Sequence, residues 1–212
     1  MRLLRSPHCP AQAVEVLADS SWVRGSRAVL VQLLRHPACP RPFAWDVLPH
    51  LGWADLLSVA REPRGAPPIR RQAERKLVER LPHMAAGERV ALARRAPRRV
   101  TAAMLREGEE RCVQALLDNP CFTEDDAVRL VASNGHAPCV VAVLRHVRWG
   151  RQPAVVSAAL RAPAVPLGVA LGLAATLPVR ELERILAVGE VSEILRDKVR
   201  VLLHRRGEGE CG

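Results

Sequence analysis

Short apolar stripes with helical spacing run along most of the chain, and prolines separate many of them. In one stripe the apolar side chains recur every four residues, which places them on one face of an α-helix: Ile69, Ala73, Leu77 and Leu81. Similar stripes lie within 112–117, 140–147 and 195–203. No segment combines sustained alternation with the Asn-Gly or Asp-Gly turns of β-hairpins. The pattern therefore predicts an all-α protein built from helices of about 8 to 14 residues.

A proline motif that occurs four times predicts where these helices end and begin. Its form is Leu-x-x-Pro-x-x-Pro, with Thr123 replacing the second proline in one copy, and its copies begin at Leu4, Leu34, Leu117 and Leu160. The first proline ends a helix because it has no N–H and its ring clashes with the preceding turn. The second proline, or Thr123, begins the next helix. Seven positions after the first proline, small apolar residues are expected to face the neighbouring repeat: Val14, Ala44, Ala127 and Ala170.

A longer internal match extends this motif. Residues 37–77 align without gaps on residues 163–203. Helices this short are marginal alone and become stable when they stack on neighbours. We therefore predict one right-handed α-solenoid of stacked helix pairs over residues 1–206, with two related super-repeats at about 1–82 and 83–206. We expect the tail at 207–212 to be disordered.

Several stretches resemble known helical repeats. The units within 34–51 and 117–130 resemble the leucine-rich-repeat variant and HEAT-like classes of bacterial α-solenoids. The stretches 80–97, 115–126 and 146–149 resemble an uncharacterised bacterial family of HEAT-like repeat proteins, and this resemblance covers most of the chain from about Leu33 onward. It implies an all-helical fold and supplies no activity. One branch of the variant class carries an iron–sulfur module with clustered cysteines; this chain lacks that cluster, so no cofactor is expected.

The charge of the chain suggests an acidic partner. The 212 residues carry a formal net charge of +10, but only two of the 32 basic residues are lysine. Such an arginine bias is also produced by GC-rich coding, so net charge alone does not identify a partner. Ten basic residues are expected to crowd one edge around Pro97 as a basic ridge: Arg70, Arg71, Arg75, Lys76, Arg89, Arg94, Arg95, Arg98, Arg99 and Arg106. The ridge is suited to phosphates or to an acidic protein surface; the alternative is a solvated helix edge.

A His-x-x-Cys spacing occurs twice, at His36 and Cys39 and at His136 and Cys139. It has two interpretations, metal binding and packing. A zinc site needs four converging ligands. Cys9 and Cys39 each follow the first proline of the motif by two residues, where a small side chain fits the turn. We therefore interpret these cysteines as packing residues and expect no metal.

The sequence favours a cytoplasmic location. The six cysteines are widely spaced, without a Cys-x-x-Cys pair, and no apolar leader is evident near the N-terminus, which is typical of free thiols in a reducing compartment. The longest charge-free run, 162–179, is just long enough to be considered as a membrane span. Its three prolines favour a buried solenoid helix, and we expect no membrane partner.

The expected function is binding without catalysis. Aromatic residues are 3% of the chain and Tyr is absent, which argues against stacking of single-stranded bases. The sequence contains no nucleophile motif, phosphate-binding glycine loop or His-Glu-x-x-His. We therefore predict a non-enzymatic scaffold that presents a concave surface to a protein partner. The alternative is a nucleic-acid-binding protein that uses the basic ridge.

A third and less favoured function is that of a HEAT-like DNA glycosylase. Such enzymes use tryptophans and an aspartate in a basic cleft, and the candidate residues would be Trp45, Asp46, Trp53, Asp55 and Trp149. In the internal match, however, Asp55 corresponds to an acidic residue at a helix start, so we expect it to have a structural role.

One further expectation concerns partners at the N-terminal end. The chain begins inside a repeat, at Leu3 and Leu4, without a polar helix to cover the first apolar face. We expect a second subunit or a neighbouring protein to cover this face.

Overall fold

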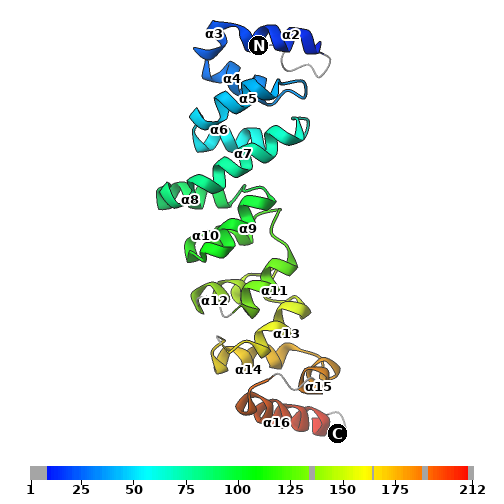
Figure 1. Ribbon diagram of the computed structural model, residues 1–212. Helices are drawn as coiled ribbons and strands as arrows, with labels where there is room; N and C mark the ends of the chain where they lie inside the picture. Colours follow the sequence, from blue (N-terminus) through cyan, green and yellow to red (C-terminus); the bar gives the residue numbers. More distant parts are fainter. Residues whose placement is uncertain (1–8, 134–136, 164, 188–190, 210–212) are drawn as a thin grey trace. The chain divides into compact units, whose positions relative to one another are not determined.

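The computed structural model (Figure 1) describes residues 9–133, 137–163, 165–187 and 191–209. All regular secondary structure in these ranges is helical, which confirms the predicted all-α class. The chain divides into two compact units, Met1–Met104 and Leu105–Gly212, named here the first and the second unit. The division falls within α9 (Arg98–Glu107), whereas the sequence places the boundary between its two super-repeats near residue 82.

Short turns join the helices of each unit. Those that precede α9 are α2 (Ala11–Asp19), α3 (Ser21–Arg24), α4 (Arg27–Leu34), α5 (Arg41–Val47), α6 (Trp53–Ala60), α7 (Pro67–Arg80) and α8 (Ala86–Ala93), with 3₁₀ turns at Leu48–His50 and Leu81–His83. Those that follow it are α10 (Glu110–Leu117), α11 (Glu124–Ala132), α12 (Ala137–Arg145), α13 (Pro153–Arg161), α14 (Leu167–Thr176), α15 (Val179–Ala187) and α16 (Glu193–Gly209). The last helix therefore ends within the tail expected at 207–212, and residues 210–212 lie outside the described ranges.

The second proline of the motif, or Thr123, stands directly before a helix wherever the motif occurs. Pro10, Pro40 and Pro166 precede α2, α5 and α14, and Thr123 precedes α11. Thr123 closes a reciprocal capping box, because its Oγ1 accepts from the backbone N–H of Asp126 at 3.3 Å and its own N–H donates to the Asp126 carboxylate at 3.0 Å. These helix starts thus lie where the sequence predicts them.

The apolar residues of the motif are buried as expected. Leu34 and Leu117 are the last residues of α4 and α10, and Leu160 is the last but one of α13. All three are at most 4% exposed. The small residues seven positions after the first proline are at most 3% exposed: Val14, Ala44, Ala127 and Ala170.

Helices two apart in the chain pack against each other within each unit. In the first unit α4 contacts α6 and α5 contacts α7; in the second, α10 contacts α12, α11 contacts α13 and α14 contacts α16. The helix starts also keep the spacing of the internal match, since ten of them form five pairs that lie 126 residues apart: 11 and 137, 27 and 153, 41 and 167, 53 and 179, 67 and 193. The observed helices therefore follow the period of the internal match.

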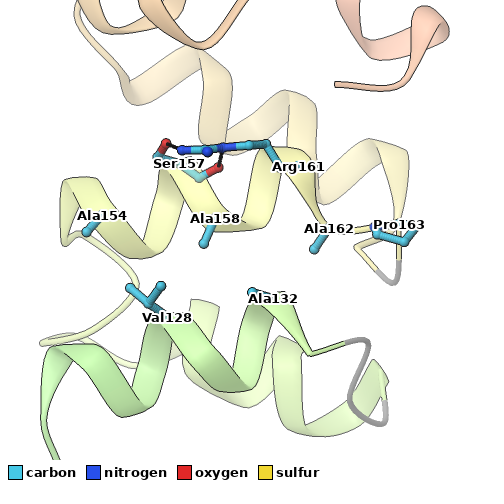
Figure 2. Close-up of a pocket in the computed structure, with 8 residues that line it drawn as sticks. All are labelled: Val128, Ala132, Ala154, Ser157, Ala158, Arg161, Ala162 and Pro163. Atoms are coloured by element: carbon cyan, nitrogen blue, oxygen red, sulfur yellow. Dashed lines mark hydrogen bonds between the residues drawn. The ribbon is translucent and has the colours of Figure 1, made fainter. Parts of the chain in front are cut away.

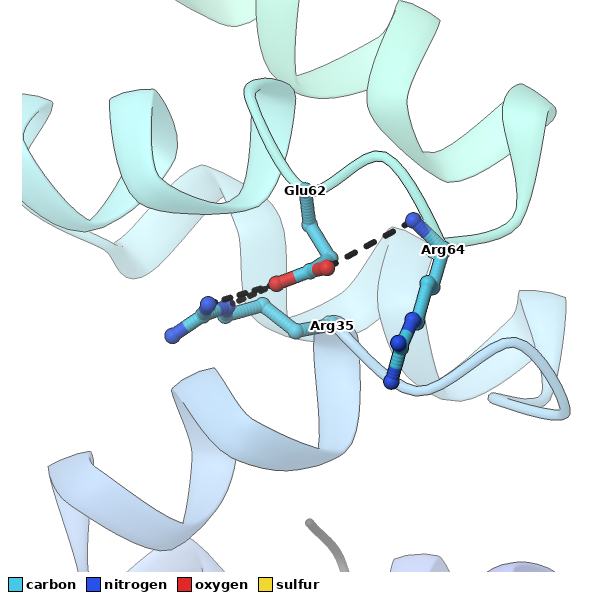
Figure 3. Close-up of polar contacts among 3 residues, drawn as sticks. All are labelled: Arg35, Glu62 and Arg64. Atoms are coloured by element: carbon cyan, nitrogen blue, oxygen red, sulfur yellow. Dashed lines mark hydrogen bonds and ion pairs between the residues drawn. The ribbon is translucent and has the colours of Figure 1, made fainter. Parts of the chain in front are cut away.

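In each unit a polar bridge joins the turns that follow two helices two apart in the chain. Arg35, just after α4, donates from Nε and Nη2 to Oε2 of Glu62, just after α6, at 2.8 and 2.5 Å (Figure 3). In the second unit His146, just after α12, lies 3.2 Å from Asp118, just after α10. The two bridges join corresponding turns, with donor and acceptor exchanged.

The second residue of each turn also closes the turn itself. His36, Glu62, Asn119 and His146 each accept, through the side chain, the backbone N–H two residues later. Such side-chain acceptors replace a helical hydrogen bond where the backbone changes direction. Because Nδ1 of His146 is an acceptor, its Nε2 carries the proton and donates to Asp118.

A second set of bridges in the first unit joins the first turns of helices that are two apart in the chain. Arg27 at the start of α4 donates to Asp55 in the first turn of α6 at 2.5 Å. Trp53 at the start of α6 donates from Nε1 to Glu88 in the first turn of α8 at 2.9 Å. In both cases the first residue of one helix bonds to the third residue of the helix two further along the chain, so these contacts hold the two helices in register.

We expect the Arg35–Glu62 bridge to stabilise the first unit. The two side chains are 35% and 15% exposed, so a double-mutant cycle with Arg35→Ala and Glu62→Ala should give a coupling energy of about 1 kcal/mol in urea unfolding followed by circular dichroism. The matched control is the exposed pair Arg24–Asp46, at 59% and 53% exposure, for which we expect about 0.3 kcal/mol. Equal couplings for the two pairs would contradict this role for the turn bridge.

The charge-free run considered as a membrane span contains α14, which is only ten residues long. Among the described helices none has the length and apolar character needed to cross a bilayer.

Candidate functional site

The basic residues of the chain are concentrated around α7, α8 and the start of α9. Residues 61–106 contain 13 Lys and Arg and four Asp and Glu, and so carry nine of the ten net positive charges. The rest of the chain is close to neutral. An arginine bias spread evenly along the sequence does not account for this concentration, which makes the segment a candidate site for an anionic partner.

The structure places nine of the ten predicted ridge residues in the first unit. Arg70, Arg71, Arg75 and Lys76 lie on α7, Arg89 on α8, Arg94 and Arg95 in the following turn, and Arg98 and Arg99 on α9. Arg106 belongs to the second unit. Arg70, Lys76 and Arg89 are partly buried, and the other six of the first unit are exposed.

Part of the ridge is neutralised by its own helix. Arg75 and Lys76 both lie beside Glu79, at 3.4 and 2.7 Å. The hydrogen bond from Lys76 lowers the pKa of Glu79. These two residues match the alternative interpretation of a solvated helix edge. The side chains of Arg94 and Arg95, by contrast, make no hydrogen bond or ion pair within the described part of the chain.

The carboxylate of Glu74 on α7 feels the charges of three arginines from two helices. Glu74 is partly buried on α7 and interacts electrostatically with Arg70 and Arg71 of its own helix and with Arg99 of α9. Burial raises the pKa of Glu74, and the three arginine charges oppose this change. Positive charge is therefore in excess around a single, partly buried acid.

The second unit carries a hollow between α11 and α13, with a volume of about 460 Å³. Small side chains from both helices line it (Figure 2): Val128, Ala132, Ala154, Ala158 and Ala162. The Arg161 side chain lies along α13, where its Nη2 donates to Ser157 Oγ at 2.6 Å and its Nε to the Ser157 carbonyl at 3.3 Å. Its charged group thus lies at the rim of an apolar depression.

A second hollow of about 460 Å³ lies on the other side of α13, towards α15. More charged residues contribute to its lining: Glu124, Pro153, Ala154, Ser157, Arg161, Glu181, Arg184 and Ile185. Ala154, Ser157 and Arg161 line both hollows, so α13 forms a low ridge between them. These hollows are not predicted from the sequence, although alanines recur at intervals of four along 154–162.

The cysteine and histidine residues weighed as metal ligands do not assemble into a site in the described ranges. His36 is buried, and its Nδ1 accepts from the N–H of Ala38 at 3.2 Å. Burial raises the pKa of the Cys39 thiol to about 12, which opposes formation of the thiolate that a metal needs. His136 lies outside the described residues, and no group of three or more His, Cys, Asp or Glu comes together among those described.

The residues weighed for glycosylase chemistry are separated or already engaged. Asp46 pairs with Arg24 at 2.6 Å and Asp55 with Arg27 at 2.5 Å. Trp149 belongs to the second unit, where it is buried and donates from Nε1 to the Leu117 carbonyl at 2.8 Å. Leu3 and Leu4, at the expected uncovered face, lie outside the described residues.

No family model, curated protein or solved structure matches this chain.

Proposed function

We propose that the protein is a non-enzymatic binding protein, a right-handed α-solenoid of HEAT-like repeats that holds a protein partner. The packing of helices two apart and the repeated helix spacing of 126 residues support this arrangement. Stacked helix pairs offer an extended concave surface, which repeat proteins commonly use to bind other proteins. The free thiols of Cys9, Cys39 and Cys139 support a reducing, cytoplasmic location.

The pair of hollows beside α13 is the observation that carries this proposal. The α11–α13 hollow presents small apolar side chains at the surface of the second unit. Such depressions accept large apolar side chains of a partner, which are the usual anchors of a protein interface. Arg161 at the rim supplies a polar group that orients the partner at the edge of the contact.

Filling the hollow tests this function. Ala158→Trp places a large ring in the α11–α13 hollow, and Ala28→Trp, at an exposed position of α4, is the control. We expect the wild-type protein and Ala28→Trp to capture the same protein from a native extract treated with nuclease. We expect Ala158→Trp to capture at least tenfold less of that protein. Circular dichroism of both variants checks that the helices remain folded. Equal capture by both variants, or capture that nuclease abolishes, would contradict a protein partner at this surface.

A second candidate function is nucleic-acid binding through the basic ridge. The net charge of +9 within residues 61–106 favours it. Binding driven by phosphate contacts weakens steeply with added salt, because each contact releases condensed counterions. Binding of an apolar anchor in the α11–α13 hollow lacks this dependence. Titration of the binding affinity with salt therefore separates the two functions.

A further inference from the structure

We propose that α16 pairs with α16 of a second copy of the protein, side by side and in the same direction, and so forms a symmetric dimer. The face that pairs carries Ile194 and Val201, which are 63% and 51% exposed. These two residues are about two helical turns apart and therefore lie on one face of the helix. This inference does not depend on the protein partner or the nucleic acid considered above.

The exposed face of α16 differs from the surfaces of the other helices. Eight large apolar side chains are exposed in the described ranges, and among these only Ile194 and Val201 share a helix. The helix contacts α14 and α15, and Leu195 and Val199 on its opposite face are buried. Ile194 and Val201 thus form an apolar stripe that the second unit leaves uncovered.

The internal match shows that the repeat does not require this stripe. The counterpart of α16 is α7, since the two helices begin 126 residues apart. At the place of Val201, α7 carries the exposed and charged Arg75, and at the place of Ile194 it carries Pro68. An apolar side chain at a position where the repeat accepts a charged one is typical of a surface that another molecule covers.

Charged side chains on the two sides of the stripe favour a second copy as the partner. With about 100° per residue, Asp197 lies about 60° from Ile194 on one side and Lys198 about 40° from it on the other. Within its own helix Asp197 makes a long ion pair with Arg200, at 3.7 Å, and its side chain remains 74% exposed. When two copies of α16 run parallel about a twofold axis, the acidic side of each helix lies beside the basic side of the other. Asp197 of each copy then faces the partner's Lys198, and the apolar stripe is buried between the two ion pairs.

The same charges oppose an antiparallel pair. In that arrangement equivalent sides of the two helices meet, so Asp197 lies beside the partner's Asp197 and Lys198 beside the partner's Lys198. Like charges at such a contact oppose association. A contact between one helix of each copy is small for a specific interface, so the dimer is reversible and is populated in the micromolar range.

Analytical ultracentrifugation over a series of concentrations, with a reductant that keeps the thiols reduced, tests the dimer. We expect the mass of the wild-type protein to rise towards that of two chains in the micromolar range. Ile194→Asp and Val201→Asp each lower the association constant by about tenfold or more, because a charge replaces part of the buried stripe. Val147→Asp is the control, at an apolar residue that is 81% exposed in the turn after α12, and leaves the constant unchanged. Circular dichroism checks that all three variants remain folded.

Reversing the charges tests the parallel arrangement. Asp197→Lys and Lys198→Asp each place like charges together at both ion pairs and lower the association constant by about tenfold. An equimolar mixture of these two variants recovers about the wild-type constant, because the two lysines of one chain meet the two aspartates of the other. This recovery also shows that neither substitution has unfolded the helix.

Each part of the proposal has its own contradicting result. Wild-type protein that remains a single chain at every concentration overturns a second copy as the occupant of this face. A dimer that Ile194→Asp and Val201→Asp leave intact pairs through another surface and overturns the assignment to α16. Charge variants that associate as the wild-type protein does, or a mixture that remains monomeric, overturn the parallel pairing.

Discussion

Trp149→Ala is expected to lower the free energy of unfolding by about 3 to 5 kcal/mol, the usual cost of deleting a large buried aromatic side chain. Trp149 is 2% exposed in the turn that follows α12. Its ring packs edge-on against Phe122 at a centroid distance of 5.2 Å, and the guanidinium of Arg148 lies 4.3 Å from its centre. The side chain therefore joins the turn after α12 to the turn after α10.

The hydrogen bond of Trp149 contributes separately. Its Nε1 donates to the carbonyl of Leu117, the last residue of α10, whose carbonyl has no partner within the helix. Trp149→Phe keeps most of the packing but leaves this buried carbonyl without the donor, at a cost of about 1 to 3 kcal/mol. Urea unfolding followed by circular dichroism at 222 nm gives both values. A loss below about 1 kcal/mol for Trp149→Ala would contradict this role.

Gly150→Ala is expected to destabilise the protein by about 3 kcal/mol, at the upper end of the range for overpacking. A Cβ at this buried position would overlap the carbonyl oxygen of Leu144 and lie 3.1 Å from that of His146. Both contacts are with backbone, which has no alternative rotamer to adopt. The N–H of Gly150 also donates to the His146 carbonyl at 2.9 Å, so the turn resists displacement.

Gly87→Ala is the matched control for this substitution. Gly87 lies in α8, and a Cβ there meets nothing within 4 Å. Because alanine favours a helix over glycine, we expect unchanged stability or a gain of up to about 1 kcal/mol. Thermal and urea unfolding of both variants checks the contrast. Similar effects of the two substitutions would show that the close approach at Gly150 is not required.

The turn that contains Trp149 and Gly150 also shows the limit of the proline motif. It lacks the proline, since Val147 stands where the other copies have one. His146 nevertheless accepts the N–H two residues later, as His36 and Asn119 do in turns with proline. Proline marks only some of these turns, whereas a side-chain acceptor for the N–H two residues later occurs in turns with and without proline.

The sequence by itself determined the helical class and many helix starts. Those starts depend on interactions within three or four residues, such as the missing N–H of proline or the capping box of Thr123 and Asp126. Local interactions of this kind depend only on residues that are close in the sequence, so the sequence alone predicts them. The burial of the small residues Ala44 and Ala127 was also predictable from the sequence. Helical spacing determines which side chains lie on the apolar face of a helix.

Only the tertiary structure decided which distant side chains meet. Arg35 and Glu62 are 27 residues apart, and Trp149 and Leu117 are 32 apart. The ten ridge residues looked equivalent in the sequence, yet Lys76 pairs with Glu79 at 2.7 Å, whereas Arg94 and Arg95 are exposed in the turn before α9. The hollow beside α13 likewise depends on the distance between two helices. Such contacts depend on how the helices pack. The periodicity of the sequence specifies which face of a helix is buried, but not which residues of another helix contact that face.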